Sequence, residues 1–573
     1  MKRPPTRSLA SLLLPALLIV AAGLWVYGPA LHGGWVWDDV EEVTQNPVLR
    51  QPGALGRIWS AAEGPDYFPL KGTVQALEWQ AWGDDPAGYH AVSLALHLLS
   101  ALLFWGVLRR LGLRHGWIGG LLLAVHPLAV ESVAWAAELK NTLSLALLLA
   151  AMTAYLEYDA RREAKGLGGN RGSPGLFYWA SLLLFLCAML SKTSVVMFPG
   201  VILLDAWWRR RMDGRVLRAS VPFFAISLVL GLVTLWFQHH RAIIAGHEFA
   251  GDPLTRLAAA GLALAFYLEK SLLPFGLLPV YPHWDLQPPA LLDFIPWLGF
   301  AALFWILWRR RATWGRPALF GLGFFALNLL PVSGLVGMAY LRISRVADHL
   351  AYLPLLGIIG LVAAALERLE SAARWTILAA VIAVLAWEGR GHAEIFHDEI
   401  TLWTYTLERN PAAWVAHNDL GQALYQEGHI PEATAHLREA LRLNPDLAEG
   451  HYNLGTVYMA THQVEAAIGE YETSLRLKPA SAGVENNLGT ALAQTGRLPE
   501  SVGHFERAVR LDPGYADAHH NLGNAYLMTG RPAEAVPEYE AALRLRPDDA
   551  AARSALEMAR RALQHGANPA SPP

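Results

Sequence analysis

Two adjacent aspartates, Asp38 and Asp39, follow the first long apolar run of the sequence, within the segment WDD. Neighbouring side chains on an irregular loop point in different directions, so we expect one carboxylate to face a cavity. The other would then serve a helix cap, a metal ion or a structural hydrogen bond. A carboxylate in a cavity suits a general base or a ligand for a divalent cation, and the sequence leaves both roles open. The alternative is a hydrated pair or an N-cap without a chemical role.

Other polar side chains lie within apolar runs or at their ends. An ionisable residue that faces hydrocarbon costs about 2.5 to 3.5 kcal/mol, so such residues face a cavity or a partner. We expect carboxylates and cations to converge on one external cavity, suited to a phosphate-bearing lipid and a deprotonated nucleophile. For the histidine at position 126 the alternative is an ordinary core residue. The candidate residues are His126, Glu131, Glu138, Lys140, Lys192, Tyr281, His283, Arg342, Arg345 and Asp348.

The composition defines the class of protein that must position these residues. The chain has 573 residues, of which 53% are hydrophobic, and it contains 22 Trp. It is too apolar for a soluble domain and too long for one domain, which indicates a polytopic membrane protein with a soluble part. The net charge of −3 gives no general attraction to nucleic acid. With one cysteine, Cys187, the chain has neither an intramolecular disulfide nor a cysteine-based metal site.

Twelve apolar runs are long enough to cross a bilayer or nearly so. Clusters of Arg and Lys mark alternate loops, which the positive-inside rule places in the cytoplasm. One run, residues 257–273, breaks this alternation, so we interpret it as re-entrant or interfacial. The prediction is eleven spans in the plasma (bacterial inner) membrane, with the aspartates and the C-terminal region on the extracytoplasmic side. The spans are near residues 9–31, 89–108, 116–136, 141–157, 176–191, 194–208, 220–238, 291–308, 316–333, 350–366 and 374–388.

The C-terminal region repeats every 34 residues, which is the period of the tetratricopeptide repeat. Proline and a Leu-Gly pair recur at this step, and small and aromatic residues alternate where paired helices must meet. The fold class is therefore all-α: a polytopic membrane domain followed by a repeat solenoid. We divide the chain into a membrane domain (residues 1–390), a junction with a half repeat (391–410), a repeat domain (411–565) and a disordered tail (566–573).

One position in each repeat, just before the Leu-Gly pair, is occupied by Asp419, Asn453, Asn487 or Asn521. A constant period stacks these side chains as a ladder on the concave face of the solenoid. An amide both donates and accepts, so the ladder could pair with the backbone of an extended acceptor polypeptide. The alternative is a local hydrogen bond within the repeats.

The chain resembles the C-type glycosyltransferases that use polyprenyl-phosphate sugars, above all the transmembrane and tetratricopeptide-repeat protein O-mannosyltransferases and their bacterial relatives. The motifs that carry the resemblance extend over nearly the whole chain. They are WDD, YFPL, GYHAVSLALH, HPLAVESVAW, SKTSVVMFP, YPH, ADHLAYLP and FHDEITLW. Relatives often read Glu-Arg-Lys-Asp where this chain has Glu138-Leu139-Lys140-Asn141, and a Thr in place of Lys71. A second acidic group and the donor preference therefore stay open.

The resemblance implies transfer of a sugar, mannose in the first place, from a polyprenyl-phosphate donor to Ser or Thr of an extracytoplasmic protein, with inversion. Asp38 or Asp39 would be the base, and Lys192, Arg342 and Arg345 would bind the donor phosphate. The remaining candidates would line the cavity. No Gly-rich phosphate loop is present, as expected for a donor that is not a nucleotide. A divalent cation at the aspartates is left open.

Two other classes of protein compete with an enzyme. A membrane-anchored repeat scaffold would explain the repeats, but an anchor needs one span rather than eleven. A transporter would carry its charged groups near the midplane and show repeated halves, whereas here the charges lie at span ends. The sequence therefore favours the glycosyltransferase.

Overall fold

The computed structural model describes residues 10–50, 53–60, 64, 66–166, 173–242 and 251–566. Within these ranges the chain forms helices and turns and has no strand, which confirms the all-α prediction. The chain divides into two compact units, Met1–Asn410 and Pro411–Pro573. The tail predicted to be disordered is residues 566–573, and all of it after residue 566 lies outside the described residues.

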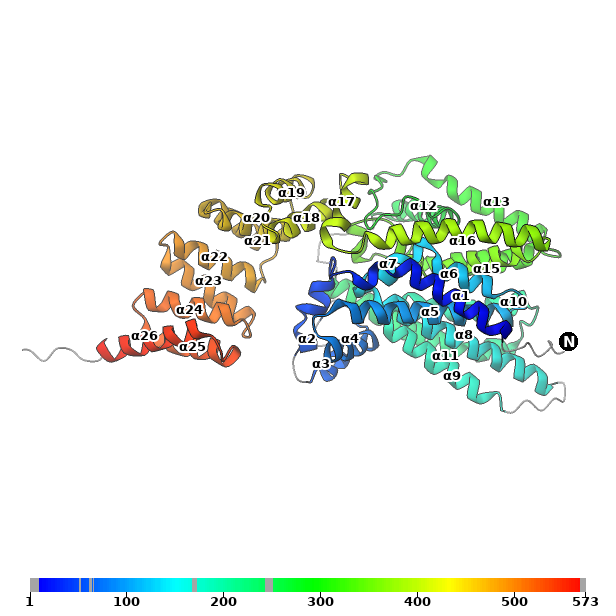
Figure 1. Cartoon of the computed structure of the whole chain (residues 1–573), viewed down its shortest axis with the longest axis horizontal. Coiled ribbons are helices and arrows are strands. Elements are labelled where there is room, and N and C mark those ends of the chain that lie inside the picture. The colour runs from blue at the N-terminus through cyan, green and yellow to red at the C-terminus, as the bar shows by residue number, and fades with distance from the viewer. Residues whose placement is uncertain are drawn as a thin grey trace, which may run out of the picture. The chain divides into compact units, whose positions relative to one another are not determined.

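The first unit is a bundle of long apolar helices joined by short helical turns (Figure 1). The long helix α8 packs against α9 and α5, and α16 packs along α1. The helices are α1 (Ala10–Tyr27), α2 (Pro47–Arg50), α3 (Ala54–Ser60), α4 (Pro69–Trp82), α5 (Pro86–Arg110), α6 (Trp117–Val125), α7 (Val130–Ala134), α8 (Leu139–Gly166), α9 (Gly175–Ser191), α10 (Phe198–Trp208), α11 (Gly214–Phe237), α12 (Pro253–Leu272), α13 (Ile295–Arg309), α14 (Gly315–Leu329), α15 (Leu355–Leu366), α16 (Ser371–Glu394) and α17 (Glu399–Arg409).

Within the described parts of this unit, six helices are long and apolar enough to cross a membrane, namely those that contain α5, α8, α11, α13, α14 and α16. A seventh span results if α6 and the segment Pro127–Ala134, which meet at 64°, are counted as one broken span. Four shorter apolar helices occupy the other predicted places. Helix α12, which we predicted not to cross, belongs to neither group. The eleven-span topology therefore requires the broken pair and the shorter helices to cross as well.

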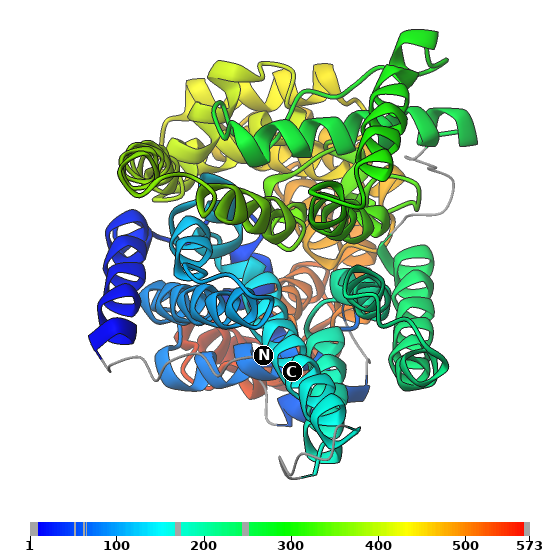
Figure 2. The same cartoon turned by 90° about the vertical axis from the view of Figure 1, so that its right-hand side faces the viewer.

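Exposed apolar side chains mark the surface of the bundle that lipid must cover. Helix α1 lies at the edge of the first unit (Figure 2). Its side chains Leu14 and Leu17 are 72% and 64% exposed. A surface of this kind is stable in hydrocarbon rather than in water, which agrees with a membrane domain.

The polar candidate residues lie where long helices are interrupted. Pro127 ends α6 and starts a short 3-10 helix, because proline cannot donate the backbone hydrogen bond that would continue the turn. This short helix is η3 (Pro127–Ala129). Similar short elements lie at or beside other polar candidates: η2 (Val40–Thr44), η4 (Ala136–Glu138), η5 (Thr193–Met197) and η10 (Asp348–Leu350).

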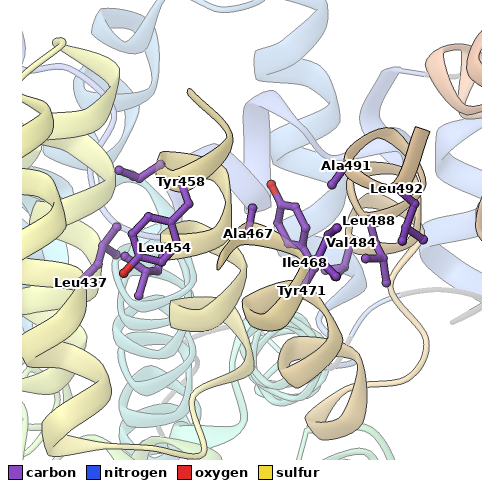
Figure 3. Close-up of a cluster of buried hydrophobic side chains, with 11 residues drawn as sticks. Leu437, Leu454, Tyr458, Ala467, Ile468, Tyr471, Val484, Leu488, Ala491 and Leu492 are labelled. Carbon is purple, nitrogen blue, oxygen red and sulfur yellow. The ribbon is translucent and has the colours of Figure 1, made fainter. Parts of the chain in front are cut away.

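The second unit is a row of paired helices with the architecture of tetratricopeptide repeats. Each repeat buries one aromatic or large aliphatic side chain between its two helices, and successive repeats share a continuous core (Figure 3). The helices are α18 (Trp414–Gln426), α19 (Ile430–Leu443), α20 (Ala448–Ala460), α21 (Val464–Leu477), α22 (Ala482–Gln494), α23 (Leu498–Leu511), α24 (Ala516–Met528), α25 (Pro532–Leu545) and α26 (Ala550–Gly566).

The Leu-Gly pairs have a steric cause. A Cβ atom added to Gly455 would lie 2.7 Å from the ring of Tyr471, which is closer than real Cβ contacts allow. Gly523 and Tyr539 show the same relationship, also at 2.7 Å. Glycine is therefore required at this step, because the first helix of each repeat approaches the aromatic ring of the second.

Candidate functional site

The two aspartates lie between α1 and η2, on a loop held by tryptophan rings. Trp37 has a backbone φ of +57°, a conformation that residues other than glycine rarely adopt. Its ring stacks on that of Trp135, with 4.5 Å between the centroids, and meets Trp403 edge-on at 5.0 Å. Trp403 belongs to α17 and is fully buried. The half repeat predicted after the last span therefore braces the loop that carries Asp38 and Asp39.

Asp39 has a structural role. Its side chain is completely buried, and its two oxygens accept hydrogen bonds from the backbone N–H of Val36 at 3.1 Å and of Ala137 at 2.6 Å. Burial, followed by the charge of Asp38, raises the pKa of Asp39, while the two backbone donors favour its ionised form. Asp39 thus fastens the aspartate loop to η4 and fills the structural role expected for one member of the pair.

Asp38 is the carboxylate suited to chemistry. Its residue is half-buried, and its Oδ1 has no hydrogen-bond partner among the described residues. Burial raises the pKa of Asp38 to about 7, Glu42 acts in the same direction, and Lys140 opposes it. A carboxyl group that titrates near neutral pH and keeps one oxygen unbonded is matched to general-base catalysis.

Next to Asp38 lies a cluster of three lysines and two glutamates. Glu138 is buried and accepts from Lys140 at 2.9 Å and from Lys192 at 3.1 Å. Asn141 also donates to Glu138. Both lysines come from interruptions of the bundle, Lys192 between α9 and η5 and Lys140 at the start of α8. Two ammonium groups therefore share one buried carboxylate, an arrangement that leaves donors available for a bound anion.

The second glutamate of the cluster is Glu42 on η2. Lys71 of α4 donates to its Oε2, and the Nζ of Lys140 lies 3.9 Å from its Oε1. Burial opposes ionisation of Glu42, but Lys71 and then Lys140 outweigh burial and lower its pKa. Glu42 is therefore ionised, and its charge is one reason why Asp38 holds its proton up to neutral pH.

Glu131 and His349 form a buried pair behind the cluster. Glu131 accepts from the backbone N–H of His349 at 2.8 Å and contacts its Nδ1 at 2.9 Å. The backbone oxygen of His349 accepts from Asn141 at 3.4 Å, which connects this pair to Glu138. His349, Asn141 and Lys192 line a narrow cavity of about 10 Å³. That volume is about one water molecule, so the cavity accommodates a small polar group and not a sugar.

Asp348, Tyr281 and His392 form a separate group. The hydroxyl of Tyr281 donates to Asp348 at 2.8 Å, and the Nε2 of His392 lies 3.7 Å from the other carboxylate oxygen. Burial raises the pKa of Asp348, and His392 acts against it. The charge of Glu131 also reaches Asp348, so this group adjoins the Glu131 pair and not Asp38.

The remaining predicted residues are His126, His283, Arg342 and Arg345. His126 caps η3, since its Nδ1 accepts from the N–H of Leu128 at 3.3 Å, and its Nε2 meets the backbone oxygen of Ser271 at 3.3 Å. His126 is thus the buried core histidine of the alternative interpretation. His283 and Arg342 are exposed, whereas Arg345 is buried and its charge acts on His283.

Among the residues that the structure describes, no group of three or more His, Cys, Asp or Glu side chains is placed to hold a metal ion. Both oxygens of Asp39 are already bonded to backbone N–H groups. A cation at this loop would therefore rest on Asp38 with at most one further carboxylate.

Two members of the cluster, Glu42 and Lys71, were not among the predicted site residues. Glu42 follows Asp38 by four residues, and the backbone N–H of Glu42 donates to the backbone oxygen of Asp38 at 2.8 Å. A spacing of four on a helical turn was a usable signal for Glu42. Lys71 lies 29 residues further along the chain, and the sequence marked it only as a departure from relatives that often have Thr at this place.

The ladder residues of the repeats bond to the preceding repeat. The side-chain amide of Asn453 donates to Asn418 at 3.1 Å, and that of Asn521 donates to Asn486 at 2.9 Å. Asn487 donates in the same way to the hydroxyl of Tyr452 at 3.3 Å. Each bond joins residues 35 apart, so it crosses from one repeat to the next. These amides therefore stabilise the stacking of repeats. Asn453 also donates to Gln422 at 3.4 Å, and the oxygen of Asn487 accepts from Asn486 at 3.3 Å, so part of their remaining capacity is used within the repeats.

The fold and these sites define a helical membrane protein that carries a buried acid-base cluster at the ends of its membrane helices and a C-terminal repeat array. Sequence models of the tetratricopeptide repeat match residues 452–516, 486–550 and 520–569, and a further model of the TPR repeat matches 421–462. The second unit consists of such repeats, as predicted.

The chain is similar to curated proteins over a length that includes residues of both units. It is 25% identical over 512 residues to human protein O-mannosyl-transferase TMTC1, an alignment that covers 77% of this chain and 57% of the relative. It is 24% identical over 534 residues to Drosophila melanogaster protein O-mannosyl-transferase Tmtc3, covering 76% and 55%. The structure of the repeat protein MamA matches 26% of this chain and 82% of its own at 24% identity, with a TM-score of 0.25.

The chain is similar to the TMTC protein O-mannosyl-transferases, with which it aligns over about three-quarters of its length. It spans only a little more than half the length of the curated relatives that it matches in this way. The relationship confirms the resemblance carried by the sequence motifs.

Proposed function

We propose that this chain is a membrane glycosyltransferase that moves a sugar, mannose in the first place, from a polyprenyl-phosphate donor to Ser or Thr hydroxyls of proteins. The observation that carries the proposal is Asp38, a half-buried carboxyl group with a pKa of about 7 and one unbonded oxygen, beside three lysines. The names of the relatives, protein O-mannosyl-transferases, supply the reaction class.

In the proposed reaction Asp38 removes the proton of the acceptor hydroxyl, whose own pKa is far above neutral. The hydroxyl oxygen forms a bond to the anomeric carbon as the bond from that carbon to the phosphate oxygen breaks. The polyprenyl phosphate leaves with the electron pair, and the single displacement inverts the anomeric configuration. Asp39, bonded to two backbone N–H groups, holds the loop in place and takes no proton in this scheme.

The leaving phosphate needs positive charge and no proton. Lys192 and Lys140 both form ion pairs with Glu138, and Lys71 forms an ion pair with Glu42. We therefore retain Lys192 as a donor phosphate ligand and add Lys140 and Lys71. Arg342 and Arg345, which the sequence suggested for the same role, remain candidates for the donor phosphate.

The acceptor is proposed to be an extended protein segment with Ser or Thr, held by the repeats. An amide has two N–H donors and one oxygen, and the recorded bonds of Asn453, Asn487 and Asn521 use only part of this capacity. We also propose that the repeats and Asp38 lie on the extracytoplasmic side of the plasma membrane, because basic loops mark the opposite side.

The proposal is tested by incubating the purified protein with polyprenyl-phosphate mannose and a Ser/Thr-rich peptide. Mannosylated peptide of inverted anomeric configuration is the expected product, and GDP-mannose without lipid should give none. The same assay after dialysis against EDTA decides on the cation: retained turnover assigns the chemistry to Asp38 alone, and loss that Mg²⁺ or Mn²⁺ restores adds a metal ion. No product from the lipid donors of mannose, glucose or N-acetylglucosamine would contradict the function.

A further inference from the structure

A second cavity of the first unit lies apart from Asp38 and its lysines. It has a volume of about 210 Å³ and is lined on one side by two turns of α16, with Trp387, Glu388, Gly391 and His392. Tyr405 of α17 closes it from the other side. The four α16 residues form two pairs spaced by four, so they occupy one face of the helix. The cavity is smaller than the roughly 300 to 1,000 Å³ of pockets for drug-sized ligands, so it fits a small head group.

Glu388 is the acidic side chain of this cavity. Among the described residues it has no recorded hydrogen bond or ion pair, although it lies in the span that contains α16. Its charge reaches Tyr405, where it raises the pKa of the phenol after the larger effects of burial, Arg409 and Asp348. An ionisable residue in a membrane helix marks a functional site unless it is paired. His392 lines the same cavity, and its Nε2 lies 3.7 Å from Asp348, too far for a hydrogen bond.

The rim of the cavity is apolar and exposed. Trp387 is 73% exposed, and Leu273 and Phe275, which flank the lining residue Pro274, are 58% and 44% exposed. Tryptophan at the end of a membrane helix is typical of the lipid interface. The cavity therefore joins a polar interior with one carboxylate to an apolar rim.

We propose that this cavity binds the amine head group of a membrane phospholipid such as phosphatidylethanolamine, with Glu388 as the partner of the ammonium group. The lining supports a cation, because it contains the acidic side chain of Glu388 and neither Lys nor Arg. The face of Trp387 adds an attraction for a cation. The acyl chains of the bound lipid then cover the exposed apolar side chains of Trp387, Leu273 and Phe275.

The test uses the full-length protein in nanodiscs of phosphatidylethanolamine and phosphatidylglycerol in equal amounts, with bound lipids counted by native mass spectrometry. One retained phosphatidylethanolamine is expected. Glu388→Gln removes the charge, and it should lower that retention about tenfold, a typical effect for one charge-assisted hydrogen bond. Gly391→Leu should have the same effect by filling the cavity, since a Cβ at Gly391 meets no atom within 4 Å.

Gly299→Leu is the matched control, because Gly299 lies in the span that contains α13 and is equally open. This variant should retain the lipid. If Glu388→Gln loses its fold, judged by its melting temperature, Gly391→Leu decides alone. Equal retention of phosphatidylethanolamine in wild type and in Gly391→Leu would overturn the proposal. Preferential retention of phosphatidylglycerol, or displacement of the lipid by a lysine-containing peptide, would overturn it as well.

Discussion

Lys192 and Glu138 lie 54 residues apart in the sequence, and a 3.1 Å hydrogen-bonded ion pair joins them at the ends of two membrane helices. Lys140 contacts the other oxygen of the same glutamate. Glu138 is therefore the residue that gathers positive charge beside Asp38, and the roles of the individual side chains can be separated by substitution.

The first prediction concerns donor binding. Lys192→Gln should raise KM for the polyprenyl-phosphate donor about tenfold or more, since a hydrogen bond to a charged group contributes about 1.5 to 3 kcal/mol. Glu138 remains paired with Lys140 in this variant, so the fold should persist. Arg342→Gln is the comparison, because Arg342 is exposed and was the alternative phosphate ligand. A larger rise in KM for Arg342→Gln than for Lys192→Gln would move the phosphate site to the arginine.

The second prediction separates the two aspartates by stability. Asp39→Asn should destabilise the first unit by about 1 to 3 kcal/mol, because an amide offers one oxygen where two backbone N–H groups need acceptors. Asp38→Asn should leave stability nearly unchanged, since burial already opposes the charge of Asp38. Thermal unfolding in detergent measures both variants. Equal melting temperatures for the two would show that Asp39 has no structural role.

The third prediction concerns pH. A base must be ionised, so kcat/KM should rise with pH through about 7, the pKa to which burial and Glu42 raise Asp38. In Glu42→Gln the negative neighbour is lost while Lys140 and Lys71 remain, so the rise should move to lower pH. Profiles of kcat/KM for both proteins measure this. If kcat/KM rises at the same pH in Glu42→Gln as in wild type, the titrating group is not Asp38.

The fourth prediction concerns the repeats. Asn487→Ala should raise KM for a long acceptor peptide and leave KM for a very short one unchanged, if the amide holds the acceptor. Tyr452→Phe removes only the bond from Asn487 to the preceding repeat, so it is the control for repeat stacking. Equal increases in both variants would restrict the ladder to the stacking of repeats.

The fifth prediction uses a difference between repeats. His451 pairs with Glu470 at 2.6 Å, and the hydrogen bond to this glutamate raises the pKa of His451. The equivalent pair in the first repeat is His417 and His436, with 2.9 Å between their Nδ1 atoms. Burial lowers the pKa of His417 and of His436.

The signs of these two shifts are opposite. The pair of His451 and Glu470 contributes stability below the ordinary pKa of histidine and loses it as pH rises through the elevated value. The pair of His417 and His436 loses stability as pH falls through the ordinary pKa, since buried neutral imidazoles must then charge. Amide hydrogen exchange on the full chain, corrected for the change of the intrinsic exchange rate with pH, should show lower protection factors in α18 and α19 at pH 5.5 than at 7.5, and His436→Glu should abolish the difference. An equal fall of the protection factors in all repeats would contradict this.

The periodic features were predictable from the sequence, and the site was predictable in part. Gly455 and Tyr471 recur with the 34-residue period because each repeat meets the same steric demand, so the repeats could be recognised without a structure. Glu138 and Lys140 could be selected because ionisable residues are costly in membrane segments. Lys71 could not be placed beside Glu42, because a contact between residues 29 apart depends on how α4 packs. Nor could the sequence distinguish Asp38 from Asp39, since the backbone N–H of Ala137 decides which of them is bonded.

The most direct measurement is the turnover of Asp38→Asn with polyprenyl-phosphate mannose and a Ser/Thr-rich peptide, beside wild type and with the melting temperature of each protein. Loss of the general base should lower kcat by about 10² to 10⁴-fold, with the melting temperature unchanged and donor binding retained. Turnover of Asp38→Asn within a factor of about two of wild type would contradict the assignment of Asp38 as the base.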